Sequence, residues 1–337
     1  MPTRGHGDPD LVRTNHGKDL KCLILCAGLG TRLKPLTLTL PKPLATVFNV
    51  PLFDIALRAC ASTGSVQMAI NTHYLADLMT QHAQTVAANL SLNNLHISHE
   101  YPAILGTGGA LCQLSGWWGE SDLLVYNGDV LSNITLSELS KRHQASANLV
   151  TLAVRKEPPR DGGRSIWLDE NDLVRYIAKR SDLPSQANRL DLREAGFACA
   201  YVVSSDFRQY LPRDPQFFDV VDGFTRAIAD GRPIGAINFS GLWADVGTPK
   251  SLWETNLKLA QMGEAERHQL LGASSRVRSL VPSTCKVDTI SVIAEDVTFG
   301  PNATIAKSVL LPGAVVQAGE NLSGCLRGLG FNESFEG

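Results

Sequence analysis

The chain has 337 residues, of which 44% are apolar and 19% are charged, and its formal net charge is −2. This length allows two domains, and the near-neutral charge provides no general attraction to nucleic acid or to an anionic membrane. Seven scattered cysteines without a C-x-x-C pair predict neither a zinc site nor a disulfide framework, and they suit the reducing cytoplasm. Residues 1–20 are polar, which predicts a flexible extension without a signal peptide, and no apolar run approaches the roughly 20 residues of a membrane span.

The first apolar segment leads into the most informative stretch of the chain. Residues 22–27 (CLILCA) predict a buried strand of a parallel sheet, which runs directly into Gly28-Leu29-Gly30-Thr31-Arg32. Glycines at these positions let backbone N–H groups approach a phosphate closely. Arg32 and Lys42 add two cations on a segment stiffened by three prolines. The stretch therefore predicts a cradle for a polyphosphate.

Two commoner glycine motifs fit this stretch less well. A dinucleotide-binding fingerprint requires a third glycine where Leu33 stands, and Pro35 opposes an immediate long helix. No part of the chain supplies the G-x-x-x-x-G-K-[ST] pattern of a Walker A loop. A purely structural turn would suit an isolated G-x-G, but Arg32 and the Pro-Lys-Pro at 41–43 argue against it.

Together, G-x-G-T-R at 28–32 and P-K-P-L at 41–44 resemble the signature of the sugar-1-phosphate nucleotidyltransferases. The resemblance covers residues 21–262. It implies an α/β fold with a Rossmann-like doubly wound mixed sheet, Mg²⁺ as cofactor, and an NTP and a sugar 1-phosphate as substrates. The residues that it assigns to catalysis are Arg32 and Lys42, and those that it assigns to the nucleotide here are Ala27, Gly28, Gly30 and Thr31.

The following segments alternate between helical and strand patterns. Helices are expected at 51–63, 74–88 and 135–146, and strands at 66–71, 95–98 and 123–127. This alternation independently favours a doubly wound sheet, in which ligands bind beyond the carboxyl ends of the strands.

A glycine-rich segment, residues 100–111, lies between two of these strands. Its three glycines leave room for a flat ring to lie against backbone, although a glycine-rich loop opening a helix near Ala110 is the simpler interpretation from the residues alone. The resemblance places this segment in the nucleobase pocket and makes Thr107, Gly108 and Glu100 nucleotide-binding candidates.

Two aspartates are candidates for metal binding. Asp129 ends a strand in the motif N-G-D, and Asp245 lies in W-x-D-x-G-T-P, just before a helix expected at 250–262. Taken alone, each would more often be a turn or capping residue. The resemblance assigns both to Mg²⁺.

Residues 150–203 change in character. Short apolar segments separated by Pro, Gly and charged turns predict antiparallel strands over one side of the cleft, at 150–155, 165–168, 173–178 and 197–203. A helix at 217–230 and a strand at 234–239 are expected to follow.

The resemblance assigns this region to the sugar phosphate. Gly163 would approach the sugar, and Lys179 would pair with the phosphate. The chain departs from the family at Ala178, where Glu is common, and at 197–199 (FAC), where N-[AS]-G is common. An alignment shifted by three residues adds two candidates, Glu194 and Gly196. These departures leave the identity of the sugar open.

The tail carries a repeat of six residues. Apolar residues recur at Val287, Ile293, Phe299, Ile305 and Leu311, which predicts a short left-handed parallel β-helix. About five hexads, under two turns, fit before the pattern fades near Gln317. So short a solenoid must bury its faces on the catalytic domain or on another subunit, which would make a homo-oligomer. The predicted organisation is an extension at 1–20, a catalytic domain at 21–262 and a β-helix segment with its tail at 263–337.

The expected reaction is attack by a sugar 1-phosphate oxygen on the α-phosphorus of an NTP, with release of pyrophosphate. The attacking phosphate is largely dianionic at neutral pH, so positioning and charge neutralisation carry the catalysis. The alternative is a catalytically silent regulatory homologue that binds a nucleotide sugar and regulates a partner through its solenoid. Four retained charged residues favour the enzyme: Arg32, Lys42, Asp129 and Asp245. The favoured substrates are GTP with mannose or heptose 1-phosphate, or UTP with an amino-sugar 1-phosphate.

Overall fold

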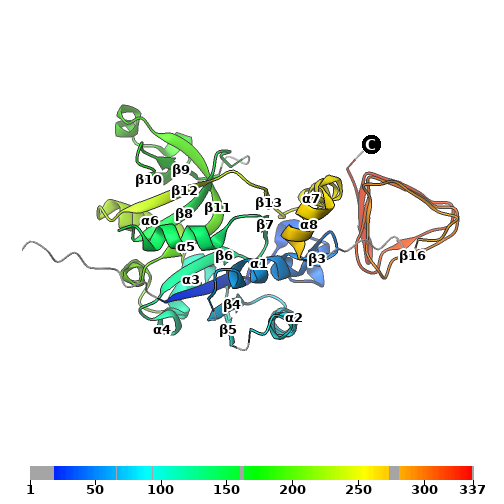
Figure 1. Cartoon of the computed structure of the whole chain (residues 1–337), viewed down its shortest axis with the longest axis horizontal. Helices are drawn as coiled ribbons and strands as arrows, with labels where there is room; N and C mark the ends of the chain where they lie inside the picture. The colour runs from blue at the N-terminus through cyan, green and yellow to red at the C-terminus, as the bar shows by residue number, and fades with distance from the viewer. Residues whose placement is uncertain (1–18, 66, 93, 160–162, 273–280, 336–337) are drawn as a thin grey trace, which may run out of the picture.

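The computed structural model describes residues 19–65, 67–92, 94–159, 163–272 and 281–335. The extension predicted for residues 1–20 lies almost entirely outside these residues. Figure 1 shows an α/β body and, next to it, a three-sided β-helix near the C-terminus. Within the described ranges, no helix combines the length and apolar character that crossing a membrane would require.

The sheet is built around strand β1 (Leu20–Leu25). It pairs in parallel with β4 (Met68–Thr72) on one side and with β6 (Asp122–Asn127) on the other, and β5 (Leu95–His99) continues the parallel part beyond β4. Both faces of β1 are covered at its centre, which is why Cys22, Leu23 and Ile24 form an uninterrupted apolar run.

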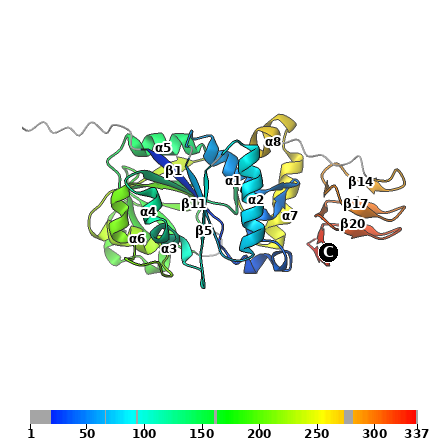
Figure 2. The same cartoon turned by 90° about the horizontal axis from the view of Figure 1, so that it is seen from below.

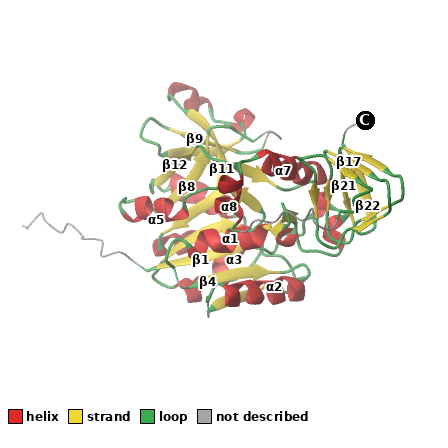
Figure 3. Cartoon of the chain, turned by 45° about the vertical axis from the view of Figure 1, so that its right-hand side comes forward, coloured by secondary structure: helices red, strands yellow, loops and turns green. Residues whose placement is uncertain are grey.

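On the other side of β6 the sheet becomes mixed. Strand β11 (Arg193–Val203) runs antiparallel to β6, and its two halves pair with different partners. These partners and their neighbours are β8 (Val150–Arg155), β9 (Ser165–Leu168), β10 (Val174–Ala178) and β12 (Ile234–Phe239). The predicted antiparallel additions are thus confirmed, and they extend the central sheet (Figure 3).

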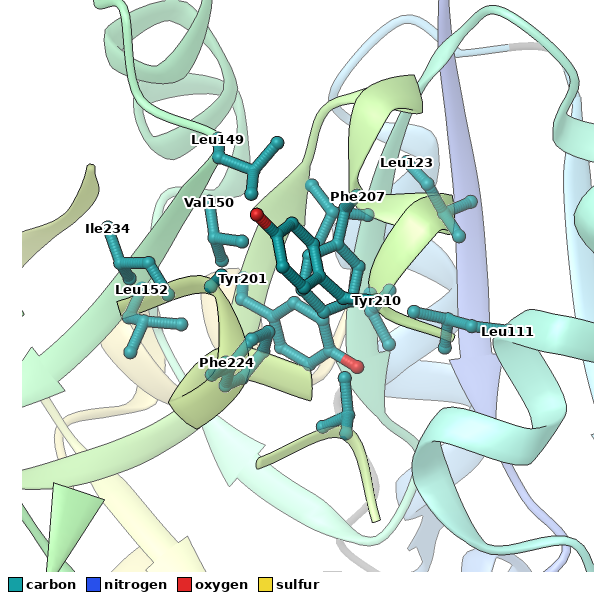
Figure 4. Close-up of a cluster of buried hydrophobic side chains, with 14 of the residues drawn as sticks. Leu111, Leu123, Leu149, Val150, Leu152, Tyr201, Phe207, Tyr210, Phe224 and Ile234 are labelled. Atoms are coloured by element: carbon teal, nitrogen blue, oxygen red, sulfur yellow. The ribbon is translucent and has the colours of Figure 1, made fainter. Parts of the chain in front are cut away.

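Helices cover both faces of the sheet, as a doubly wound fold requires. One face carries α1 (Leu52–Ala61), α2 (Ala76–Asn89) and α5 (Leu136–Gln144). The other carries α3 (Gly106–Gln113), α4 (Ser115–Trp118) and α6 (Val220–Ala229). The hydrophobic core between the sheet and α3, α4 and α6 is rich in aromatic rings. Within it, Tyr201 and Phe224 are in edge-to-face contact, with 5.4 Å between ring centroids (Figure 4).

Two helix starts differ from the sequence expectation because of contacts between distant segments. The helix expected at 217–230 begins at Val220, since Phe218 is held extended by a hydrogen bond from its N–H to the Leu105 carbonyl. The Phe218 carbonyl in turn accepts from Gly108 N–H, and α3 begins at Gly106 instead of near Ala110. Pairing of these two segments therefore fixes where both helices start.

The C-terminal β-helix is confirmed, but its predicted extent of under two turns was wrong. Its strands stack in parallel every 17 or 18 positions, since Lys286 pairs with Thr304 and Thr304 with Asn321. A third coil therefore begins beyond Gln317. The spacing from coil to coil is 17 positions there, and Leu322 and Leu326 keep the interior apolar. Figure 2 shows the successive rungs; the strands are β14 (Lys286–Val287), β15 (Val292–Ile293), β16 (Thr298–Phe299), β17 (Thr304–Ala306), β18 (Val309–Leu310), β19 (Val315–Val316), β20 (Asn321–Ser323), β21 (Cys325–Gly328) and the antiparallel β22 (Phe331–Ser334).

Helix α7 (Pro249–Gln261) joins the β-helix to the α/β body, and a short helix, α8 (Glu264–Leu271), follows it. The buried Trp253 on α7 donates its Nε1–H to the Lys307 carbonyl at 2.8 Å and packs on the Phe335 ring. The β-helix thus docks on the catalytic part of its own chain, which is one of the two arrangements expected.

We expect replacement of Trp253 by Ala to reduce the free energy of unfolding by about 3–5 kcal/mol, because it removes a large buried ring and its hydrogen bond. Urea denaturation measures the change. Phe217→Ala is the control, since this ring is 71% exposed and its loss should cost no more than about 0.5 kcal/mol. Equal stability of the two variants would contradict the docking role of Trp253.

Candidate active site

The predicted phosphate loop follows β1 at the carboxyl edge of the sheet. Its backbone is anchored by Cys26, whose N–H donates to Asn71 Oδ1 at 2.7 Å. Gly30 has φ +61°, and a Cβ there would meet Thr37 Cγ2 at 2.9 Å, so glycine is needed for this turn. A Cβ at Gly28 would meet nothing within 4 Å, so one side of the loop is open. Thr31 is exposed and Ala27 is buried at the end of the strand.

Short 3₁₀ turns replace a long helix after this loop, as the prolines predicted. They span η1 (Thr31–Leu33), η2 (Leu36–Leu38) and η3 (Lys42–Leu44). The last of them turns the Lys42 side chain inward, where it is buried. The loop and its two predicted cations therefore belong to one compact segment.

Four predicted charged residues meet beside this segment. Lys42 Nζ lies 2.6 Å from Asp129 Oδ2 and 3.4 Å from Asp245 Oδ1. Arg32 NH2 lies 3.6 Å from Asp245 Oδ2, and its side chain is 64% exposed. The chain thus brings together both predicted cations and both predicted metal ligands.

Strand pairing holds the two aspartates side by side. Asp129 lies between β6 and β7 (Val130–Ser132), and β7 pairs antiparallel with β13 (Trp243–Asp245) so that Asp245 faces Val130. Helix α7 starts just beyond, and Thr248 Oγ1 caps it by accepting from Ser251 N–H at 3.1 Å. Both carboxylates are therefore fixed by regular structure.

The charge state of Lys42 follows from its surroundings. Burial alone would lower the pKa of the Lys42 ammonium, but the Asp129 and Asp245 carboxylates outweigh burial and raise the pKa above its ordinary value of 10.5. The resulting stabilisation is fully present below pH 10.5 and is lost as the pH rises through the pKa of the folded state. Lys42 is therefore a cation throughout the neutral range.

The donor set of this centre fits Mg²⁺. Asp129 and Asp245 already converge on one cationic group, and Mg²⁺ is usually bound by one or two carboxylates together with water and substrate phosphates. In the described part of the chain, no group of three or more His, Cys, Asp or Glu side chains could hold a metal ion. The fit is thus to a metal that shares its coordination with a phosphate ligand.

Glu100 lies behind the glycine-rich segment, at 0% exposure. Its Oε1 accepts from Asn71 Nδ2 and its Oε2 from Leu105 N–H, both at 2.7 Å. Because Asn71 also holds Cys26 N–H, this buried network ties the phosphate loop to the predicted base loop. These contacts give Glu100 a positioning role between the two loops, and its direct contact with the nucleotide stays a prediction.

Thr107 and Gly108 are used for packing against α6. Thr107 Oγ1 accepts from Val220 N–H at 3.0 Å and donates to Asp219 Oδ1 at 3.3 Å. A Cβ at Gly108 would meet Phe218 Cδ1 at 2.6 Å. The Thr107 side chain is thus held by residues at the start of α6, and its contact with the nucleobase stays a prediction.

On the expected sugar side, the candidate residues lie on or beside three paired strands, β9, β10 and β11. Glu194 accepts from Ser165 Oγ at 2.8 Å and pairs with Arg180; burial alone would raise the pKa of Glu194, but these partners lower it below its usual value. Gly196 is buried, and a Cβ there would overlap the Glu157 carbonyl oxygen. The remaining candidates are Lys179, which is exposed just after β10, and Gly163, just before β9.

Sequence reasoning missed two residues that organise the site. Asn71 bonds the phosphate loop directly through Cys26 N–H and the glycine-rich loop through Glu100. The sequence feature that could have revealed it is a polar residue near the end of a fully buried strand. Asp219 caps α6, accepts from Thr107 and pairs with Arg164 next to Gly163, so it joins the base side to the sugar side. The sequence feature that could have revealed Asp219 is an Asp directly before a helical pattern, the usual place of a helix N-cap.

Comparison with known proteins assigns this geometry to a family. Residues 21–262 match the family model described as nucleotidyl transferase, which covers more than half of the chain. The chain therefore belongs to the nucleotidyl transferase family and is a nucleotidyltransferase enzyme.

Its relatives include several enzymes of one specificity. The mannose-1-phosphate guanylyltransferase of Mycobacterium tuberculosis is 29% identical over 308 residues, covering 90% of this chain and 82% of the relative. A probable mannose-1-phosphate guanylyltransferase 1 of Oryza sativa is 27% identical over 314 residues, covering 91% and 80%. The mannose-1-phosphate guanyltransferase of Schizosaccharomyces pombe is 27% identical over 295 residues, covering 86% and 74%.

Replacing Lys42 by Met should leave the two carboxylates facing each other without their shared cation. We expect unfolding to require about 1–3 kcal/mol less free energy, and Mg²⁺ to raise the melting temperature of the variant more than that of the wild type. Lys250→Met is the matched control, because Lys250 makes only an exposed pair with Glu254. An identical Mg²⁺ response in all three proteins would refute the shared cation position.

Replacing Glu100 by Gln should loosen both loops. A Gln amide offers one acceptor oxygen to two donors, and Asn71 cannot invert its own amide without losing the bond from Cys26 N–H. We expect a loss of about 1–3 kcal/mol in stability and faster hydrogen exchange at the Cys26 and Leu105 amides. Glu138→Gln, at an exposed ion pair on α5, should change neither, and unchanged protection of both amides in Glu100→Gln would exclude the network.

Proposed function

We propose that this enzyme transfers the guanylyl group of GTP to mannose 1-phosphate, giving GDP-mannose and pyrophosphate. The general reaction, transfer of a nucleotidyl group from an NTP to a sugar 1-phosphate, follows from the family and from the relatives. The observation that carries the proposal is the meeting of Lys42, Asp129 and Asp245 at the open phosphate loop. The choice of GTP and mannose is supported by the names of those relatives.

The difficulty of this reaction is the approach of two anions. A sugar 1-phosphate is largely dianionic at neutral pH and needs no general base to attack, so the protein has to position it and neutralise charge. When the triphosphate of an NTP is bound in the phosphate loop, Lys42 would neutralise charge at its α-phosphate, next to Asp129 and Asp245. Its raised pKa keeps it cationic for that purpose.

Arg32 has a different role from Lys42. Its guanidinium is largely exposed and makes only a long contact to Asp245, so it can move onto the triphosphate without breaking buried structure. A planar donor fork suits the oxygens of the triphosphate and of the leaving pyrophosphate. Mg²⁺, held by Asp129 and Asp245 when bound, would supply further positive charge between the two reactants.

The proposal is tested by measuring pyrophosphate release with Mg²⁺ while GTP, UTP, dTTP, CTP and ATP are crossed with a panel of sugar 1-phosphates. We expect GTP with mannose 1-phosphate to give the highest kcat/KM. We also expect Asp129→Ala to lower that value by at least about a hundredfold, because it removes a ligand that fixes charge at the reacting phosphates.

Asp206→Ala, which removes an exposed carboxylate, is the control and should retain wild-type activity. Preference for UTP with an amino-sugar 1-phosphate would correct the substrates while keeping the class of reaction. Binding of a nucleotide sugar without turnover of any pair would overturn the proposal in favour of a silent homologue.

A further inference from the structure

The strands predicted to bind the sugar phosphate lie at one end of the central sheet. β9 and β10 form that end, whereas β4 and β5 form the other (Figure 1). Lys179, the residue predicted to bind the phosphate, follows β10 directly and is exposed. The place of the Lys179 side chain in the site therefore depends on what holds this end of β10.

The end of β10 lies beside the start of β9. Ala178, the last residue of β10, faces Ser165, the first residue of β9, across their antiparallel ladder. The residues just beyond this pair, Lys179 and Arg164, therefore lie at the same end of the two strands. Ser165 is itself held by β11, because its Oγ donates to Glu194 Oε1 at 2.8 Å. Any contact that holds Arg164 thus also holds the backbone next to Lys179.

Arg164 is tied to α6, which lies outside these strands. Its guanidinium NH2 donates to Asp219 Oδ2, and its NH1 lies 3.7 Å from Asp222 Oδ1. Asp219 is the N-cap of α6, since its Oδ1 accepts from Val221 N–H at 3.1 Å. The arginine is therefore held by a carboxylate whose own position is fixed by the start of a helix.

The same carboxylate reaches the base loop, residues 100–111. Thr107 Oγ1 donates to Asp219 Oδ1 at 3.3 Å and accepts from Val220 N–H at 3.0 Å. Thr107 and Arg164 thus use different oxygens of Asp219, although they lie 112 and 55 positions from it in the chain. One side chain therefore connects the predicted nucleobase side to the predicted phosphate-binding end of β10.

The contribution of this ion pair to overall stability is small. The side chains of Arg164 and Asp219 are 44% and 35% exposed, and partly exposed ion pairs contribute little to the free energy of unfolding. In contrast, a reaction that depends on the placement of two anions is sensitive to displacements of about 1 Å. The main consequence of the pair is therefore the distance between Lys179 and the base loop.

We propose that Arg164 and Asp219 are positioning residues, which hold Lys179 where it binds the phosphate of the sugar 1-phosphate. The proposal rests on the proposed function for the identity of this substrate and for the role of Lys179. It adds that the pair fixes this phosphate relative to a nucleotide in the base loop. Binding of the nucleotide therefore raises the affinity for the sugar phosphate partly through Arg164 and Asp219.

The test is calorimetric titration of a sugar 1-phosphate into enzyme with Mg²⁺, in the presence and absence of an NTP analogue that carries a methylene between its α- and β-phosphates. The nucleotide and sugar used are the pair that the wild type binds most tightly. With the analogue bound, we expect Arg164→Met to raise the Kd for the sugar phosphate about three- to tenfold. The factor by which the analogue improves sugar-phosphate affinity should fall, while the Kd of the analogue alone should change by no more than about twofold.

Asp219→Asn separates positioning from direct contact with the phosphate. The Asn oxygen can still accept from Val221 N–H and Thr107, but the anionic partner of Arg164 is lost. If the pair positions Lys179, Asp219→Asn should also raise the Kd about three- to tenfold. If Arg164 bound the phosphate itself, Asp219→Asn would release the arginine and leave the Kd unchanged or lower, and this result would overturn the proposal.

Lys179→Met tests whether the pair acts through Lys179. We expect this change alone to raise the Kd for the sugar phosphate about ten- to a hundredfold. Adding Arg164→Met to it should have no further effect, because the lysine that the pair positions is already gone. An unchanged Kd in Lys179→Met, or full additivity of the two changes in log Kd, would overturn the proposal.

Arg175→Met is the matched control. It breaks the ion pair of Arg175 with Asp169 at the opposite end of the same two strands, and the Arg175 side chain is 47% exposed. This variant should keep the wild-type Kd, and melting curves confirm that every variant is folded. An equal rise of the Kd in Arg175→Met and Arg164→Met would indicate general loosening of the strands and overturn the proposal.

The choice of substrates does not affect this comparison. A wild-type preference for another nucleotide or sugar 1-phosphate would correct the proposed function, but the ratios of Kd between variants and wild type would still be measured with the preferred pair. Unchanged ratios in folded Arg164→Met and Asp219→Asn would overturn the positioning role alone.

Discussion

The site depends on one ammonium group held by two carboxylates. Lys42 lies 87 positions from Asp129 and 203 from Asp245 in the chain, yet its Nζ contacts both. Each partner is fixed by a different device: Lys42 by a proline-flanked 3₁₀ turn, Asp129 by the end of β6, and Asp245 by the pairing of β13 with β7. Since the lysine is buried, its charge needs these partners, and the three segments must come together before the centre can carry phosphate chemistry.

Several side chains at the phosphate loop and the glycine-rich loop hold the backbone of these loops in place. Glu100 and Asn71 satisfy amides of the phosphate loop and the base loop, while Thr107 and Asp219 join that base loop to α6. A buried carboxylate that accepts one hydrogen bond on each oxygen fixes the distance between the two loops that supply the donors. Backbone groups positioned in this way leave the charged contacts with the nucleotide to Arg32 and Lys42 beside the phosphate loop.

Local sequence patterns predicted some strands and site residues, whereas features that depend on contacts between distant segments were missed. The strands at 150–155, 165–168 and 234–239 were predicted with their observed bounds, because both of their faces are largely apolar and turns flank them. The starts of α3 and α6 were missed, because hydrogen bonds between segments over 100 residues apart decide them. Arg32, Lys42, Asp129 and Asp245 lie in local motifs, whereas no local motif marks Asn71, whose contacts with Cys26 and Glu100 form only when three segments meet in the fold.

Helix α7 links the docked β-helix to the strand that carries Asp245. Helix α7 begins four residues after Asp245. Its Asn256 accepts a hydrogen bond from the N–H of Phe48, which lies in the turn between β2 (Thr46–Val47) and β3 (Val50–Pro51). Between the start of α7 and Asn256, Trp253 contacts the β-helix. Support from both sides resists rotation of the helix and so fixes the strand that carries Asp245. Trp243 lies on that same strand, so this ring and the predicted metal ligand Asp245 share one support. A shift of β13 would therefore disturb the carboxylate centre, and the docked β-helix supports that centre through α7.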